Sequence, residues 1–176
     1  FYEWQKKGYI KKIIKLFYVF ADKKISENEL CFIANKLIEP SYLSLEYALR
    51  YYNLIPEMVH LLTSITTRKT KMIESSVGNF RYQSVKENLF FGYKIVEMNG
   101  VSFKIAEPEK ALLDFMYLRS DINNENDIAE LRINQEIFHE IINLEKLKKY
   151  AAMFNSKILF QKILLIPKIN KEVIII

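Results

Sequence analysis

The sequence predicts an α+β protein in which a basic N-terminal hairpin precedes a small antiparallel sheet packed with C-terminal helices. Two observations predict this class. Runs of β-branched and aromatic residues, separated by turn residues, occupy residues 61–106. Segments with N-cap residues and helical apolar spacing occupy residues 25–52 and 108–165. Strands and helices therefore fall in separate stretches of the chain, which is typical of α+β folds.

The first 24 residues indicate the end of a DNA-binding module. They contain a helix tail, a turn at Gly8, a strand from Tyr9, a turn near residues 13–15 and a second strand through Phe17–Phe20. This is the order of the closing half of a winged helix, so residues 1–24 are predicted to be the recognition-helix tail and the wing. The predicted DNA contacts are five lysines that can lie along a phosphate backbone: Lys6, Lys7, Lys11, Lys12 and Lys15. The alternative is an ordinary surface hairpin with solubilising lysines.

Residues 25–39 are predicted to form a helix that connects this module to the rest of the chain. Ser26 and Glu29 have the spacing of a capping box at its start, and Glu39–Pro40 stops it. Its apolar face is expected to consist of Leu30, Ile33, Ala34 and Leu37. A C-terminal domain, residues 40–176, is predicted to follow.

The C-terminal domain is predicted to begin with a short helix and a sheet. Ser44 can cap a helix over residues 45–52, which Asn53 and Pro56 end. Asn99 and Gly100 give the strongest hairpin signal in the chain. Strands of a mostly antiparallel sheet are expected over residues 61–67, 80–85, 94–97 and 102–105.

Helices are predicted for the last third of the chain. Pro108 begins the first, with Glu107 and Glu109 at its positively polarised end. Its core-facing stripe is expected to be Ala111, Leu112, Phe115, Met116 and Tyr117. After a polar loop at residues 121–126, helices are expected over residues 130–142, 144–154 and 157–165, the last ended by Pro167. The apolar tail, residues 173–176, could add a strand to the sheet or pair with a partner.

Composition limits the class of protein. The 176 residues suffice for one core or two small domains, and a hydrophobic content of 50% argues against disorder. The single Cys31 provides neither a disulfide framework nor a cysteine metal cluster, which fits a cytoplasmic protein. No apolar run approaches the length of a membrane span, and the start is not a signal peptide. Because the chain opens with Phe1 rather than methionine, upstream residues are expected to be missing.

The net charge of +5 is unevenly distributed along the chain. Residues 1–24 carry seven lysines against two acids, whereas residues 107–149 carry ten acids against six bases. A second basic stretch covers residues 68–94. Where it begins, over residues 64–71, hydroxyls and cations meet at a strand end. This pattern could bind phosphate or an acidic partner through Thr67, Arg68, Lys69, Lys71 and Arg81. The alternative is a polar loop after a strand.

The chain lacks the residue patterns of common catalytic sites. His60 and His139 are far apart in sequence, and no glycine-rich phosphate loop or nucleophile elbow is present. Glu107, Glu109 and Lys110 faintly resemble a nuclease site, although helix capping explains the two acids more simply. We therefore expect no catalytic residue, no metal site, no cofactor and no enzymatic activity.

Several segments together resemble AbiEi-type antitoxins, the antitoxin and regulator halves of abortive-infection, type IV toxin–antitoxin systems. The likeness covers residues 1–118 well and the last third by helical pattern only. It is carried by residues 4–10, 17–20, 40–49, 51–57, 63–70, 80–82, 89–93 and 105–114. In two respects the chain departs from the family: Leu16 occupies a position where glycine is usual, and the helices expected before Trp4 are absent.

The resemblance implies a bacterial cytoplasmic protein with two activities. The N-terminal module would bind operator DNA and repress its own operon, and the C-terminal domain would counteract a cognate nucleotidyltransferase-like toxin without necessarily contacting it. A plain winged-helix regulator, whose C-terminal domain senses a ligand or dimerises, is the main alternative. A nuclease-type enzyme is the third hypothesis.

Overall fold

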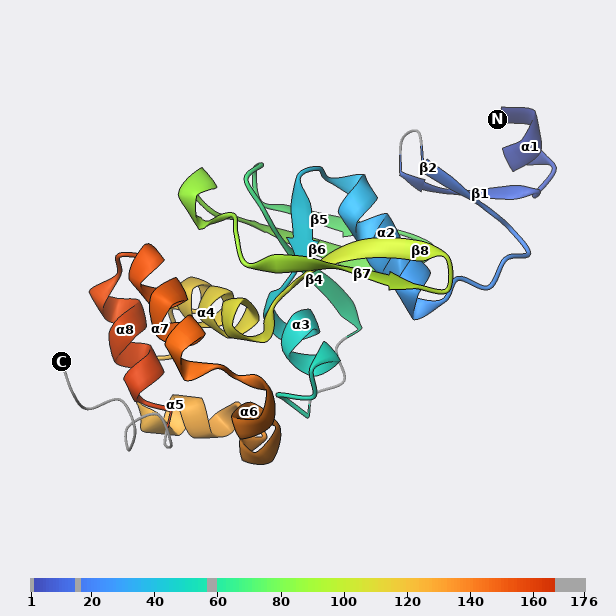
Figure 1. The fold of residues 1–176 in the computed structure, drawn as a ribbon. Helices are drawn as coiled ribbons and strands as arrows, with labels where there is room; N and C mark the ends of the chain where they lie inside the picture. The colour runs from blue at the N-terminus through green and yellow to red at the C-terminus, as the bar shows by residue number, and fades with distance from the viewer. Residues whose placement is uncertain (1, 15–16, 57–59, 167–176) are drawn as a thin grey trace.

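The computed structural model describes residues 2–14, 17–56 and 60–166, and Figure 1 shows how they are arranged. An N-terminal helix and hairpin lie at one end of the molecule. A six-stranded sheet with two helices forms the middle, and five further helices gather at the other end (Figure 1). The predicted α+β class is confirmed.

The N-terminal segment contains the predicted helix end and hairpin. Helix α1 (Tyr2–Lys6) ends in a turn at Gly8, whose φ of +74° suits glycine. Strands β1 (Ile10–Ile14) and β2 (Phe17–Phe20) pair antiparallel, with a bulge between Lys12 and Ile14. These elements are compatible with a winged-helix remnant, and that assignment stays a prediction.

The central sheet has the strand order β5-β6-β4-β3-β8-β7. Its strands are β3 (Ser41–Leu43), β4 (Leu61–Thr66), β5 (Lys71–Glu74), β6 (Asn79–Ser84), β7 (Tyr93–Met98) and β8 (Val101–Ala106). The β3–β8 and β4–β6 pairs are parallel, and the other three pairs are antiparallel. The sheet is therefore mixed, and the prediction of an antiparallel sheet was wrong for these two pairs. β3 lies between β4 and β8, and β5 lies at the edge of the sheet, so β6 pairs with β4 in parallel.

Two of these strands were not predicted. Strand β3 is only three residues long, too short for an alternating pattern to be recognised. Strand β5 buries only Ile73, so its sequence resembles a polar loop. The predicted hairpin between β7 and β8 is confirmed: Asn99 and Gly100 both have positive φ, +52° and +77°, as a type I′ turn requires.

Helix α2 (Glu27–Leu37) forms part of the main body rather than only a connector. Its buried residues are Cys31, Ala34, Asn35 and Leu37, so the predicted face is correct at two positions and shifted at the others. The Tyr82 hydroxyl of β6 donates to the Ala34 carbonyl at 2.6 Å, and α2 packs along β8. Helix α2 therefore packs on the sheet that follows it in the sequence.

The predicted capping box at the start of α2 is confirmed. The backbone N–H of Ser26 donates to the Glu29 carboxylate at 2.9 Å, and the Glu29 N–H donates to the Ser26 hydroxyl at 3.3 Å. The hydrogen bond from Lys23, followed by those from Ser26, lowers the pKa of Glu29 from 4.5 to about 2. The carboxylate therefore stabilises the folded protein when it is ionised.

This pKa shift predicts an acid-dependent loss of stability. Because the folded pKa of Glu29 lies below the unfolded value, its contribution is fully present above pH 4.5 and is lost as the pH falls toward about 2. In the Glu29→Gln variant, the free energy of unfolding should fall less over this range than in the parent. Glu140→Gln, at an exposed position, is the control and should leave the slope unchanged. Parallel acid curves for the parent and the Glu29 variant would contradict this prediction.

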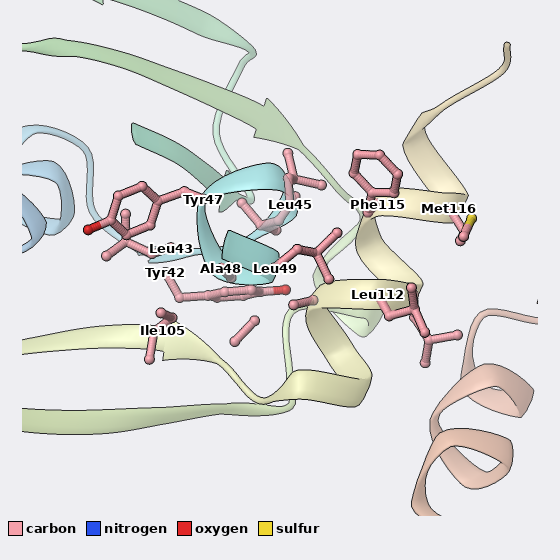
Figure 2. Packing of buried hydrophobic residues seen from close by; sticks show 14 of the residues in the cluster. Tyr42, Leu43, Leu45, Tyr47, Ala48, Leu49, Ile105, Leu112, Phe115 and Met116 are labelled. Atoms are coloured by element: carbon pink, nitrogen blue, oxygen red, sulfur yellow. The ribbon is translucent and has the colours of Figure 1, made fainter. Parts of the chain in front are cut away.

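Helix α3 (Leu45–Tyr51) lies beside α2 and α4. Ser44 occupies the N-cap position of α3, as predicted, but its side chain forms no capping hydrogen bond. Its hydroxyl instead donates to Asp114 at 2.9 Å. The helix is tied to α2 by Arg50, which pairs with Glu27 at 2.7 Å. In Figure 2, Leu45 and Leu49 of α3 lie on the side of α4, whereas Tyr47 points the other way, and its hydroxyl lies 2.9 Å from the Cys31 sulfur of α2.

Five helices complete the fold. They are α4 (Pro108–Leu118), α5 (Glu125–Glu130), α6 (Gln135–Ile141), α7 (Leu144–Met153) and α8 (Lys157–Leu164). A short 3-10 turn, Glu87–Leu89, lies between β6 and β7. The helix predicted over residues 130–142 was wrong in its first part. Asn124 caps α5 and Asn134 caps α6, and Arg132 between them has a φ of +47° that breaks the helix. Pro167 and the predicted tail strand lie outside the described residues.

Lys162 of α8 fastens the C-terminal helices to α4. Its ammonium donates to the Met116 carbonyl at 3.2 Å and to the Arg119 carbonyl, at the negatively polarised end of α4.

Among the described helices, none has the length and apolar character that crossing a membrane requires.

Candidate nucleic-acid interface and anion-binding cleft

The hairpin exposes its lysines to solvent. Lys6, Lys7, Lys11 and Lys12 are all exposed, and Lys15 lies outside the described residues. Lys11 pairs with Val19 and Lys12 with Tyr18, so the two side chains lie on opposite faces of the ribbon. Within the described part of the chain, none of these four lysines forms an ion pair with a carboxylate. Their charges are therefore available to a polyanion.

The apolar side of the hairpin packs toward α2. Ile13 is buried in the main core, and with Phe17 it lines a groove of about 480 Å³ whose other wall includes Phe32 and Ile33. Trp4 and Tyr9 remain 52% and 60% exposed. The aromatic residues of this module are thus partly exposed and partly packed on α2, as expected for a hairpin with few supporting elements of its own.

The second set of predicted binding residues does not form one cluster. Thr67, Arg68 and Lys69 lie in the loop between β4 and β5, and Lys71 begins β5. Lys71 pairs with Tyr82 across the strands, and Met72 pairs with Arg81. Because paired residues share a face and successive residues alternate, Lys71 and Arg81 lie on opposite faces of the sheet.

Arg68 is held at the mouth of a cleft. The Arg68 Nε–H donates to the Glu39 carbonyl at 3.3 Å, and the Thr66 hydroxyl donates to the Pro40 carbonyl at 2.7 Å. The cleft has a volume of about 540 Å³ and lies between the C-terminal half of α2, the start of β3 and β8. Lys36 and Lys104 also line it, and neither was predicted from the sequence.

The cleft follows from the way β3 meets β8. These parallel strands pair only at Leu43 and Ile105, so they are not joined further toward their amino ends. The backbone N–H of Lys104 there donates to the side-chain oxygen of Asn35 instead of to a strand. The Asn35 side chain of α2 thus takes the place of a neighbouring strand as the acceptor for β8, and the cleft lies beside it.

A second group of polar residues is fully enclosed and was not predicted from the sequence. Lys110 and Asp114 of α4 form an ion pair whose side chains are both inaccessible to solvent. The Tyr42 and Ser44 hydroxyls donate to the other carboxylate oxygen of Asp114 at 3.0 and 2.9 Å. Burial lowers the pKa of Lys110 and raises that of Asp114, and the attraction between the two charges opposes both shifts.

Aromatic rings surround the Lys110 ammonium. Its nitrogen lies 4.8 Å from the ring centre of Phe91, 4.7 Å from that of Phe154 and 5.7 Å from that of Tyr42. These cation–π contacts add to the ion pair in a setting without water. The i,i+4 spacing of Lys110 and Asp114 was the available sequence signal, but only burial distinguishes this pair from an exposed one.

Of the residues that faintly resembled a nuclease site, the two acids lie together, but Lys110 is not with them. Lys110 points to Asp114, whereas Glu107 and Glu109 pair with Lys146 of α7 at 2.9 and 3.4 Å. The Tyr150 hydroxyl also donates to Glu107 at 2.7 Å. No group of three or more potential metal ligands occurs among the residues that the structure describes. These acids link α7 to the start of α4.

Comparison with protein-family models and with curated proteins finds no match for this chain. The likeness to AbiEi-type antitoxins therefore rests on the sequence segments alone.

Proposed function

We propose that this protein is a DNA-binding antitoxin of a bacterial type IV toxin–antitoxin system that represses its own operon in the cytoplasm. One observation carries the DNA-binding half: a helix–turn–hairpin segment exposes four lysines, with cations on both faces of its ribbon. The antitoxin half is supported by the sequence resemblance, which extends through the sheet and α4.

A two-stranded ribbon with cations on both faces suits a DNA groove, whose two walls are both lined by phosphates. The major groove admits such a ribbon. Lysine contacts to phosphate set position and affinity but carry no sequence information. Helix α1 contributes only five residues. We therefore expect this chain to bind DNA in the nonspecific range, with a Kd of roughly 10⁻⁴ to 10⁻⁶ M at physiological salt.

Neutralising the hairpin lysines should flatten the salt dependence of DNA binding. In the Lys11→Gln, Lys12→Gln, Lys15→Gln variant, the slope of log K against log salt should become shallower by up to about 2.7, since each phosphate contact contributes about 0.9. Fluorescence anisotropy with a labelled duplex at 50 to 200 mM salt measures this slope. Operator and random duplexes should lose affinity alike.

The control changes two exposed lysines at the other end of the molecule, Lys149 and Lys157, to glutamine. If this control flattened the slope as much as the hairpin variant, binding would follow overall charge and the hairpin would have no special role.

The antitoxin half is tested separately by co-expression with the neighbouring nucleotidyltransferase-like gene, scored as rescue of growth. Failure to rescue would leave a plain DNA-binding regulator.

That second candidate, a winged-helix regulator whose C-terminal domain senses a ligand, is favoured by the cleft beside α2. A regulator of this kind needs a binding site remote from its DNA contacts, and the cleft lies in the main body rather than on the hairpin.

A further inference from the structure

The cleft beside α2 is lined by two buried residues that carry hydrogen-bonding atoms without partners. Asn35 is 8% exposed and Ser41 is 2% exposed. Neither the Asn35 amide nitrogen nor the Ser41 hydroxyl has a hydrogen-bond partner among the residues that the structure describes. Buried polar atoms are nearly always paired in folded proteins, so these two atoms call for a partner that the chain does not supply.

The Asn35 amide has a defined orientation. Its oxygen accepts the backbone N–H of Lys104, which fixes the amide plane and leaves the NH₂ group as an unused donor. The Ser41 hydroxyl can donate or accept. Both residues line the same cleft. The two unpaired atoms are themselves closed to solvent, so they lie beneath the surface of the cleft.

The charges around the cleft favour an anion. Lys36, Arg68 and Lys104 line it, against the single carboxylate of Glu39. Glu39 pairs with Lys36 at 2.8 Å, and the hydrogen bond from Lys36 lowers the pKa of Glu39. Three cations and one ionised acid leave an excess of two positive charges. Within the part of the chain that the structure describes, the Arg68 guanidinium is engaged only at its Nε–H, by the Glu39 carbonyl, so its two terminal nitrogens can bind an oxyanion.

The size and the apolar wall of the cleft indicate more than a bare ion. Its volume of about 540 Å³ lies within the range of small-molecule sites. Phe32 forms part of one wall and Ile95 part of the rim. The cleft thus combines a cationic, hydrogen-bonding part with an aromatic surface on which a flat ring could stack.

We propose that this cleft binds a nucleoside monophosphate, with the phosphate against Arg68, Lys36 and Lys104 and the base against Phe32. This site is separate from the proposed DNA contacts on the hairpin and adds a ligand-binding activity to the protein.

The test is isothermal titration calorimetry of the full chain with the four ribonucleoside monophosphates, the corresponding nucleosides and inorganic phosphate. At least one monophosphate should bind, and its nucleoside should bind at least tenfold more weakly. Arg68→Gln should weaken binding tenfold or more, whereas Lys69→Gln, the same charge change at the neighbouring exposed residue, should change it less than twofold. Asn35→Asp keeps the acceptor for Lys104 and should also lose binding.

Three outcomes would overturn the proposal: no monophosphate binding at millimolar concentration, equal binding of nucleoside and monophosphate, or equal effects of the Arg68 and Lys69 changes. A short oligonucleotide without terminal phosphate distinguishes the source of the phosphate. If it binds in an Arg68-dependent manner while the monophosphates do not, the cleft contacts a nucleic-acid backbone and the proposal is wrong. The hairpin variant should bind the monophosphate like the parent, so failure of the cleft and failure of the DNA contacts are distinguishable.

Discussion

Replacing Asp114 with alanine should lower the free energy of unfolding by about 3–5 kcal/mol, because it leaves the Lys110 ammonium buried without its counter-charge. Both side chains are inaccessible to solvent. The substitution also removes the acceptor of the Tyr42 and Ser44 hydroxyls, which are buried with it. Urea denaturation followed by circular dichroism measures the loss.

Two variants show whether the loss comes from the isolated charge. Lys110→Met combined with Asp114→Leu removes both charges and should cost less than Asp114→Ala alone, since no unpaired charge remains. Glu145→Ala breaks an exposed pair with Lys148, of 3.2 Å, and should cost less than about 1 kcal/mol. If Asp114→Ala were as mild as Glu145→Ala, the ion pair would not stabilise the core in this way.

Deleting residues 1–39 should leave a chain that does not fold cooperatively, whereas deleting only residues 1–24 should leave a folded domain. Helix α2 buries Cys31 and Ala34 against the sheet and accepts the Tyr82 hydroxyl at its Ala34 carbonyl. Without the helix, the sheet loses this cover and the Lys104 N–H loses its acceptor on Asn35. Domains are stable by only about 5–15 kcal/mol, so the loss of a whole packed helix is decisive.

Thermal unfolding monitored by circular dichroism compares the two fragments. The 25–176 fragment should melt in one transition and, if the protein is an antitoxin, rescue growth in the presence of the toxin. It should not bind DNA through the hairpin, which it lacks. A cooperative transition in the 40–176 fragment would contradict this prediction and would return α2 to the role of a connector.

Much of the local structure was predictable because its causes lie within a few residues. The capping box of Ser26 and Glu29, the turn at Asn99 and Gly100 and the start of α4 at Pro108 each depend on backbone hydrogen bonds and dihedral angles that neighbouring residues satisfy. The exposure of Lys11 and Lys12 on a hairpin was predictable for the same reason.

Strand β3 and the parallel pairs could not be predicted in this way. Three residues, Ser41–Leu43, carry no periodic signal, and they form a strand only because β4 and β8 supply partners from distant parts of the chain. Ser44 shows the same dependence on tertiary structure: its sequence suits an N-cap, but the fold brings Asp114 within reach of its hydroxyl.

The two polar sites differ from the sequence prediction for one physical reason: burial and long-range contact have no local pattern. Arg68 was recognised as a candidate for phosphate binding. Lys36 and Lys104 line the same cleft because β3 and β8 pair only at Leu43 and Ile105 and are not joined closer to their amino ends. Lys110 and Asp114 have the ordinary i,i+4 spacing of an exposed helical pair. Only the packing of aromatic rings around them removes water and turns a common surface interaction into part of the core.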